Sequence, residues 1–352
     1  MSAEIRIDQL SGMRTILAPG RADRPEGFVA PTHTPKGPEG CPFCEGREER
    51  TPPELYAVRP GGGEADGPGW LVRVVPNLYP ALSPPGSDEA PARRSTEPPE
   101  GAFAAAGDPL AASRRAGEAD LFSARPALGA HEVIIHSPRH VTTMGELDEE
   151  QFALAIDAWR ERMRAHRDAA YVQLIVNEGG GAGASLEHSH AQLYALPFVP
   201  PAVARERERV RSYRERTAGG DLLSDLLVEE VRRKERLVAI DDDAALICPW
   251  ASRSPFELRV VPRRPAPRFE DDDCGAAMLR TALRALTARF GGSPELNLWV
   301  HTAPSGVEEF RWHVDVLPRL TVRAGFELST GVDINVYPPE RAAADLRETL
   351  GG

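Results

Sequence analysis

Residues 183–192 read GASLEHSHAQ, and two histidines and a glutamine alternate at the end of this stretch. If His188-Ser189-His190-Ala191-Gln192 forms a strand, His188, His190 and Gln192 project from one face, roughly 7 Å apart per step. Just upstream, residues 177–185 read NEGGGAGAS, a loop small enough for backbone N–H groups to approach a phosphate. An imidazole beside such a loop can act as nucleophile, general base or metal ligand. On these residues alone, two surface histidines or a simple metal-binding histidine pair are as well supported as a catalytic role.

The segments around this stretch occur twice in the same order. The first half has a helix that begins after Asp148 and strand-like runs at 71–76, 132–135, 171–176 and 192–196. The second half has a helix at 278–290 and strand-like runs at 245–248, 256–262, 296–300 and 310–316. In both halves a strand ends in proline plus arginine and a helix of similar length follows. We therefore predict an α+β fold of two tandem halves with antiparallel sheets.

This repetition divides the chain into residues 1–200, which carry the histidine stretch, and residues 201–352. A charged and helical connector is predicted at 205–235. Between 83 and 127 the composition shifts to Pro, Ala, Gly, Ser and charged residues, which is typical of an insert without fixed structure.

Composition limits the classes of partner. The chain holds 42 Lys and Arg against 53 Asp and Glu, a net charge of −11, so we expect neither nucleic acid nor an anionic membrane as partner. No stretch approaches the ~18 apolar residues of a membrane helix, and the N-terminus lacks the layout of a signal peptide. Four cysteines do not make a disulfide scaffold, and the two-residue gap between Cys41 and Cys44 suggests metal or redox chemistry. We expect a cytoplasmic protein.

A series of short motifs resembles the galactose-1-phosphate uridylyltransferase-like branch of the histidine-triad superfamily, which also includes plant-type ADP-glucose phosphorylases. The resemblance covers nearly the whole chain apart from the 83–127 insert. The motifs, in the family's order, are Ala18-Pro19-Gly20-Arg21 with Arg24-Pro25, Cys41-Pro42-Phe43-Cys44, Thr51-Pro52-Pro53-Glu54, Val75-Pro76-Asn77 with Tyr79-Pro80, His131-Glu132-Val133, Ser137-Pro138 with His140, Gly183-Ala184-Ser185 with His188-Ser189-His190-Ala191-Gln192, and Gly325-Phe326-Glu327-Leu328.

The resemblance implies two histidine-triad-like halves, of which the first is catalytic and the second degenerate. It also implies a double displacement on a nucleoside-diphosphate sugar. His190 would attack the α-phosphate, release a sugar 1-phosphate and leave a nucleotidyl-histidine, which a second phosphate then resolves. Gln192 would donate to a phosphate oxygen as a neutral group, and Ser185 with the backbone around Gly183 would hold the remaining oxygens.

The resemblance assigns further substrate contacts. They are Arg21, Arg24, Asn77 and Asn177 near the nucleotide and Glu327 at the sugar.

The acceptor side departs from the family. Thr321 stands where some uridylyltransferases have a lysine, with Arg323 the nearest cation, and Asp333 stands where many relatives have an aromatic or amide residue. An anion is unfavourable near a phosphorylated acceptor unless it binds sugar hydroxyls, so the identity of the acceptor stays open.

Cys41 and Cys44 alone supply half of a tetrahedral zinc site. By resemblance, His140 and His188 complete a Cys2His2 site without an open position, and this one structural zinc would orient His190 through His188. The alternative is a lone redox or unoccupied CxxC.

We expect no second metal. Relatives carry second sites of two kinds. At the places of a CxxC and two histidines this chain has Asp221, Ser224, Pro265 and Arg311, a set that cannot bind zinc. A site of one glutamate and three histidines is loosely echoed by Glu206, His301, His313 and Asp315.

We predict a hexose-1-phosphate uridylyltransferase that uses a UDP-hexose and a sugar phosphate, and by resemblance a homodimer. The alternatives are an ADP-glucose phosphorylase or adenylyltransferase, and a catalytically silent nucleotide- or zinc-binding protein. The intact pair of His190 and Gln192 argues against silence, because a binding module needs no nucleophile.

Overall fold

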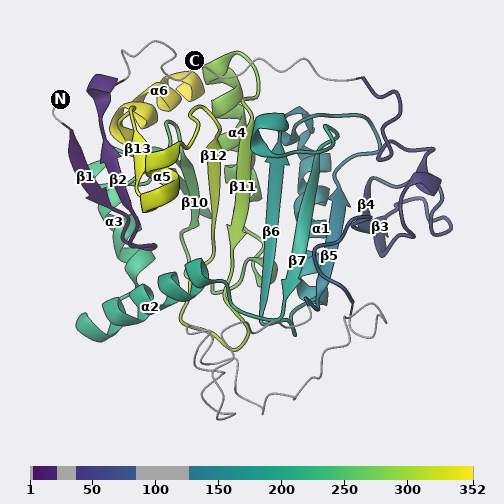
Figure 1. Ribbon diagram of the computed structural model, residues 1–352, viewed down its shortest axis with the longest axis horizontal. Helices are drawn as coiled ribbons and strands as arrows, with labels where there is room; N and C mark the ends of the chain where they lie inside the picture. Colours follow the sequence, from purple (N-terminus) through teal and green to yellow (C-terminus); the bar gives the residue numbers. More distant parts are fainter. Residues whose placement is uncertain (1–2, 22–36, 85–126, 352) are drawn as a thin grey trace.

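The computed structural model describes residues 3–21, 37–84 and 127–351 (Figure 1). Arg24 and nearly all of the predicted insert at 83–127 lie outside the described residues. Among the described residues, no helix combines the length and the apolar character that a membrane crossing requires.

One antiparallel sheet of ten strands forms the frame of the molecule. Its order is β3-β4-β5-β7-β6-β11-β12-β10-β9-β8. The strands of the first half are β3 (Tyr56–Val58), β4 (Val72–Pro76), β5 (Ala130–Ile135), β6 (Tyr171–Glu178) and β7 (His190–Leu196). Those of the second half are β8 (Leu237–Ile240), β9 (Ala244–Ile247), β10 (Leu258–Pro262), β11 (Leu296–His301) and β12 (His313–Pro318).

The strand order confirms the predicted repetition. The five strands of the second half mirror those of the first, and β6 and β11 pair at the centre. His190 is the first residue of β7 as His313 is of β12, and Gln192 and Asp315 follow two positions later. The α+β fold with two tandem halves is thus confirmed. The division at residue 200 remains a proposal, because both halves share one sheet.

Two helices in equivalent places cover one face of the sheet. α1 (Glu149–Ala165) follows β5 and α4 (Ala276–Phe290) follows β10. α1 begins where predicted, because the Asp148 carboxylate accepts the Gln151 N–H at 2.9 Å and caps the first turn. Phe152 and Trp159 of α1 are buried in the main apolar core, together with inward-facing residues of the sheet. This core packs behind β7, the strand that begins at His190, and leaves the opposite face of the sheet for a site.

The remaining elements pack on both faces of the sheet. The predicted connector at 205–235 is helical, as α2 (Pro201–Arg216) and α3 (Leu222–Arg233). A small sheet of β1 (Glu4–Ile7), β2 (Arg14–Leu17) and β13 (Asp333–Asn335) was not predicted. It lies with α5 (Gly325–Thr330) beside the second half of the large sheet, and α6 (Pro339–Gly351) ends the chain (Figure 1).

Two predicted strands begin later than the sequence suggests. β10 starts at Leu258 rather than at residue 256, because Phe256 has a φ of 59°, which a strand does not allow. β12 starts at His313 rather than at residue 310, because the Trp312 N–H is bonded to Ala266 O in a neighbouring loop.

Candidate active site and metal centre

His190 opens β7 on the face that the helices leave uncovered. Its Nδ1 lies 2.7 Å from His188 O, which can only accept, so Nδ1 carries the proton. Burial lowers the pKa of His190, which keeps the ring neutral. Nε2 therefore has a free lone pair, and the residue has the tautomer that a nucleophilic imidazole requires.

Four sulfur and nitrogen atoms meet beside this strand. Zinc with Zn–S of about 2.3 Å and Zn–N of about 2.05 Å in tetrahedral geometry separates S from N by about 3.6 Å. Cys41 Sγ lies 3.5 Å from His188 Nδ1, and Cys44 Sγ lies 3.5 Å from His140 Nδ1 and 3.7 Å from His188 Nδ1. All four ligand atoms lie within 4.8 Å of one another. The four predicted ligands thus fit a Cys2His2 zinc site.

The candidate metal site and His190 are joined through one residue, His188. His188 Nε2 donates to Ser137 O at 2.8 Å, which leaves Nδ1 free to face the metal position. The carbonyl of the same residue accepts from His190. In addition, the Phe43 ring, between the two cysteines, lies edge-on to the His190 ring with centroids 5.3 Å apart. His188 and Phe43 thus connect the four candidate ligands to His190.

Gln192 is held by two residues to which sequence reasoning gave no role. Its Oε1 lies 2.9 Å from His131 Nε2 and accepts from the Tyr194 hydroxyl at 3.0 Å. Strand alternation places Tyr194 on the face of Gln192, but His131 reaches this face only because β5 pairs with β7. Asn77, a predicted nucleotide contact, lies beside His131, since its N–H donates to His131 O at 2.8 Å.

The glycine-rich loop differs from the predicted phosphate cradle. The Gly181 N–H donates to the Glu295 carboxylate at 3.0 Å, and the Gly183 N–H donates to Gly180 O. At Gly179, with a φ of 85°, a side chain would bring Cβ within 2.3 Å of Glu295 Cγ. The loop needs glycine because Glu295 packs against it. The N–H of Gly183 is already used, so any phosphate contact there must come from elsewhere.

Two other predicted contacts flank this loop. Ser185 is exposed at its end. Asn177 is the last residue but one of β6 and lies opposite β11, where its Oδ1 accepts from Asn297 Nδ2 at 2.7 Å. Asn297 also donates to Ala182 O at 2.8 Å, so it holds Asn177 and the loop together.

Arg21 and Glu327 lie on elements away from β7. Arg21 is exposed just after β2, and Glu327 lies in α5, where its carboxylate accepts the Ala324 N–H at 3.0 Å. Figure 1 places β2 and α5 beside the second half of the large sheet. Neither residue is brought next to His190 within this chain.

The unusual acid on the acceptor side is neutralised within the chain. Asp333 is buried in β13, and Arg323 Nε lies 2.9 Å from its Oδ1. The Nε–H of Arg323 is thus engaged by Asp333.

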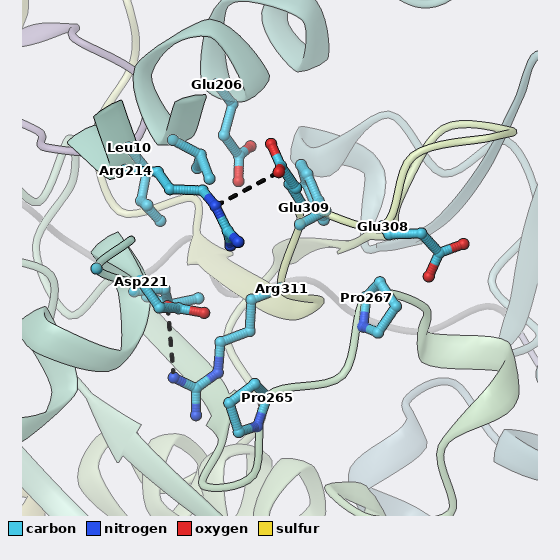
Figure 2. Close-up of a pocket in the computed structure, with 13 residues that line it drawn as sticks. Leu10, Glu206, Arg214, Asp221, Pro265, Pro267, Glu308, Glu309 and Arg311 are labelled. Carbon is cyan, nitrogen blue, oxygen red and sulfur yellow. Dashed lines mark ion pairs between the residues drawn. The ribbon is translucent and has the colours of Figure 1, made fainter. Parts of the chain in front are cut away.

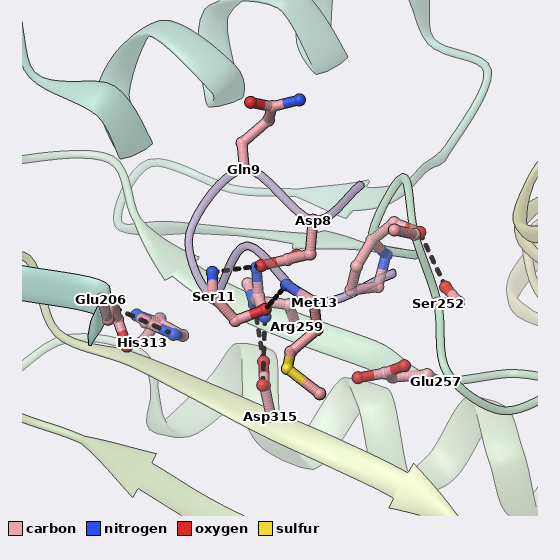
Figure 3. Close-up of polar contacts among 12 residues, drawn as sticks. Asp8, Gln9, Ser11, Met13, Glu206, Ser252, Glu257, Arg259, His313 and Asp315 are labelled. Carbon is pink, nitrogen blue, oxygen red and sulfur yellow. Dashed lines mark hydrogen bonds and ion pairs between the residues drawn. The ribbon is translucent and has the colours of Figure 1, made fainter. Parts of the chain in front are cut away.

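The second group of possible ligands is also brought together. Glu206, His301 and His313 place one ligand atom each within 4.8 Å of one another, and Figure 3 shows Glu206 beside His313. Asp315, which would be a fourth ligand, is paired with Arg259 at 2.6 Å, and its other oxygen lies 3.4 Å from His301 Nε2. The expectation of a single metal stays a prediction.

The guanidinium of Arg311 stands among Asp221, Ser224 and Pro265, the other residues considered for a second metal. Arg311 donates to Ser224 Oγ and to Pro262 O, and it lies 3.9 Å from Asp221 Oδ1. It lines a cavity of about 200 Å³ under α2, which Figure 2 shows together with Pro265. The side chain connects the start of α3 to the end of β10 without a metal.

Several known proteins are similar to the chain over most of its length. Residues 75–200 match the family described as galactose-1-phosphate uridyl transferase, N-terminal domain. An ADP-glucose phosphorylase of Arabidopsis thaliana is 31% identical over 361 residues, which covers 99% of this chain and 93% of that protein. A galactose-1-phosphate uridylyltransferase of Cryptococcus neoformans is 26% identical and covers 98% and 90%. The crystal structure of an ADP-glucose phosphorylase from Arabidopsis thaliana with bound ADP-glucose superimposes with a TM-score of 0.75 at 28% identity, over 99% of both chains.

Proposed function

The chain belongs to the family of galactose-1-phosphate uridylyltransferases and ADP-glucose phosphorylases and is a nucleotidyltransferase, and on that premise we propose that His190 carries the nucleotide between two phosphates. The observation that supports this role best is the bond from Nδ1 to His188 O, which leaves Nε2 free. The substrate class is a nucleoside-diphosphate sugar.

In the first step the Nε2 lone pair forms a bond to the α-phosphorus, and the bond from this phosphorus to the bridging oxygen breaks. Sugar 1-phosphate leaves with that oxygen and its electron pair, and the ring of the adduct becomes cationic. The His188 carbonyl stabilises this charge through the Nδ1–H, while Gln192 donates to a phosphoryl oxygen. A phosphate oxygen of the second substrate then attacks the same phosphorus and frees His190.

Two substrate pairs compete. The first is UMP transfer from a UDP-hexose to a hexose 1-phosphate, as the names of many relatives say of them. The second is phosphorolysis of ADP-glucose, as the name of the Arabidopsis relative says of it. The 31% identity to that phosphorylase over 99% of this chain supports the second pair.

Incubation with UDP-glucose or ADP-glucose labelled at the α-phosphate tests the proposal. We expect an acid-labile labelled protein with one of them, no label in His190→Ala, and normal label in the control His166→Ala. His166 follows the last residue of α1 and is hydrogen-bonded to Glu132, outside the site. An undiminished adduct in His190→Ala would contradict the nucleophile. Adding galactose 1-phosphate or inorganic phosphate to the labelled enzyme, after removal of glucose 1-phosphate, then identifies the acceptor by which one removes the label.

We also propose that Cys41, Cys44, His140 and His188 hold one structural zinc, with no open position and no part in the bond exchange. When bound, the metal supplies a fixed support for His188.

A homodimer is the third part of the proposal. Val322 and Leu328 beside and within α5 are 89% and 72% exposed, and Ile5 of β1 is 67% exposed; we propose that the partner covers these apolar side chains. Arg21 and Glu327 lie away from the His190 of their own chain. In a dimer they would complete the active site of the partner chain. A mass measurement of the purified protein in solution tests the dimer, and a monomer would contradict it.

A further inference from the structure

We infer that His131 and Tyr194 are positioning residues that lock the side-chain amide of Gln192 in one orientation, with its oxygen turned to them and its NH2 left for the substrate phosphate. The inference rests on the proposed nucleotidyl transfer, and it concerns two residues to which the resemblance assigned no role.

The orientation follows from the protonation of His131. The Ala81 N–H donates to His131 Nδ1 at 3.1 Å, so Nδ1 is the nitrogen with the lone pair. A neutral imidazole has one such nitrogen, so Nε2 carries the proton. Burial lowers the pKa of His131, in keeping with a neutral ring. The group that faces Nε2 at 2.9 Å must therefore accept, which makes it the oxygen of Gln192.

Asn77 does not change this assignment. Its Nδ2 lies 3.1 Å from His131 Nε2, but its Oδ1 already accepts the Tyr79 N–H at 2.9 Å, so the amide cannot turn to offer oxygen. Two donors thus meet near Nε2, and only Gln192 is available to accept the His131 proton.

Tyr194 supports the same orientation. Its hydroxyl lies 3.0 Å from the Gln192 oxygen, and its ring stacks on the His131 ring with centroids 4.0 Å apart. The stack holds both donors on one side of the amide. The Gln192 oxygen thus has two partners, and turning the amide by 180° would break both bonds and bring NH2 against the Nε2–H of His131.

This lock matters because glutamine offers both a donor and an acceptor. An amide turned the wrong way would present its oxygen to a phosphoryl oxygen, and two acceptors repel each other. Held as observed, Gln192 presents only N–H groups on the strand face that it shares with His190, where negative charge accumulates during transfer.

A mutant cycle on the first half-reaction tests the inference, with the rate of labelled adduct formation and the Kd of the nucleotide sugar as readouts. His131→Phe keeps an aromatic ring against Tyr194 but removes the donor, and we expect the rate to fall about 10- to 100-fold, since loss of a whole oxyanion donor costs about 100- to 1000-fold. The Kd should change less than about threefold, and Tyr194→Phe should give a smaller loss. His131→Gln, whose amide nitrogen reaches the place of Nε2, should restore part of the rate.

The deciding measurement repeats His131→Phe in a Gln192→Ala background. If His131 acts through Gln192, the second change slows the reaction less than about twofold there. Equal losses in both backgrounds would show a general structural effect and overturn the inference, while the adduct itself would still support the proposed function. Absence of any adduct in the wild type would overturn the proposed function and, with it, this inference.

Discussion

Removal of the proposed zinc should lower both the stability and the rate of adduct formation. The cluster closes a long loop, since Cys44 and His140 are 96 positions apart. By the chain-entropy relation, a cross-link over such a loop contributes about 4–5 kcal/mol. With an unfolding entropy of about 2.1 cal/mol/K per residue, a chain of 352 residues should melt about 6 °C lower without it. The rate should fall as well, because His188 supports the tautomer of His190.

The assay is thermal unfolding and zinc analysis of the wild type, of Cys44→Ser and of the control Cys248→Ala. Cys248 is buried behind the sheet and belongs to the main core, so its variant should keep one zinc per chain and lose only a small amount of stability. A wild type that carries no zinc and forms the adduct at full rate would refute the reasoning. So would a Cys44→Ser variant that loses its zinc and melts within about 1 °C of the wild type.

Three further predictions concern single positions. Burial raises the pKa of Glu178 to about 7, so the free energy of unfolding is greatest when this group is protonated and should fall by about 3 kcal/mol from pH 4.5 to above 7. In urea unfolding curves, Glu178→Gln should lack this part of the decline. Parallel pH profiles of the variant and the wild type would contradict the prediction. Gly179→Ala should cost about 2–3 kcal/mol of unfolding free energy, because Gly179 has a positive φ and contacts Glu295. Gly180→Ala should cost under about 0.5 kcal/mol, because the space around its Cβ is open. Equal costs would contradict the packing argument. Metal analysis should find one zinc per chain in both the wild type and Glu206→Gln, and a second metal lost in the variant would show that this cluster binds one.

Local patterns predicted the elements that local forces form. The helix after Asp148 follows from its cap and from apolar spacing, and both are readable within a few turns. The small sheet was missed because β2 pairs with β13, whose residues Asp333–Asn335 lie more than 300 positions further along the chain. Three-residue strands carry no periodic signal of their own.

The site was predictable to the extent that its motifs are contiguous or that the family supplies the missing partners. Cys41 and Cys44 suggested a metal from their spacing, whereas His140 came only from the resemblance. The pairing of His131 with Gln192 depends on the register between β5 and β7, which no local pattern reveals. Similarly, the loop glycines suggested a phosphate, and only the structure shows the Glu295 carboxylate in contact with them.

The continuous pairing of β6 with β11 limits how this enzyme can move during turnover. The two halves share a ladder from Leu296 opposite Glu178 to Val300 opposite Leu174, so neither can swing as a rigid lobe without breaking backbone hydrogen bonds. A transferase that exchanges one phosphate for another must release its first product before the second substrate enters. Here product release and substrate entry have to proceed without a hinge between the halves, through movements of surface segments and side chains above the rigid sheet. The turnover rate should then depend on the movement of those segments and not on separation of the two halves.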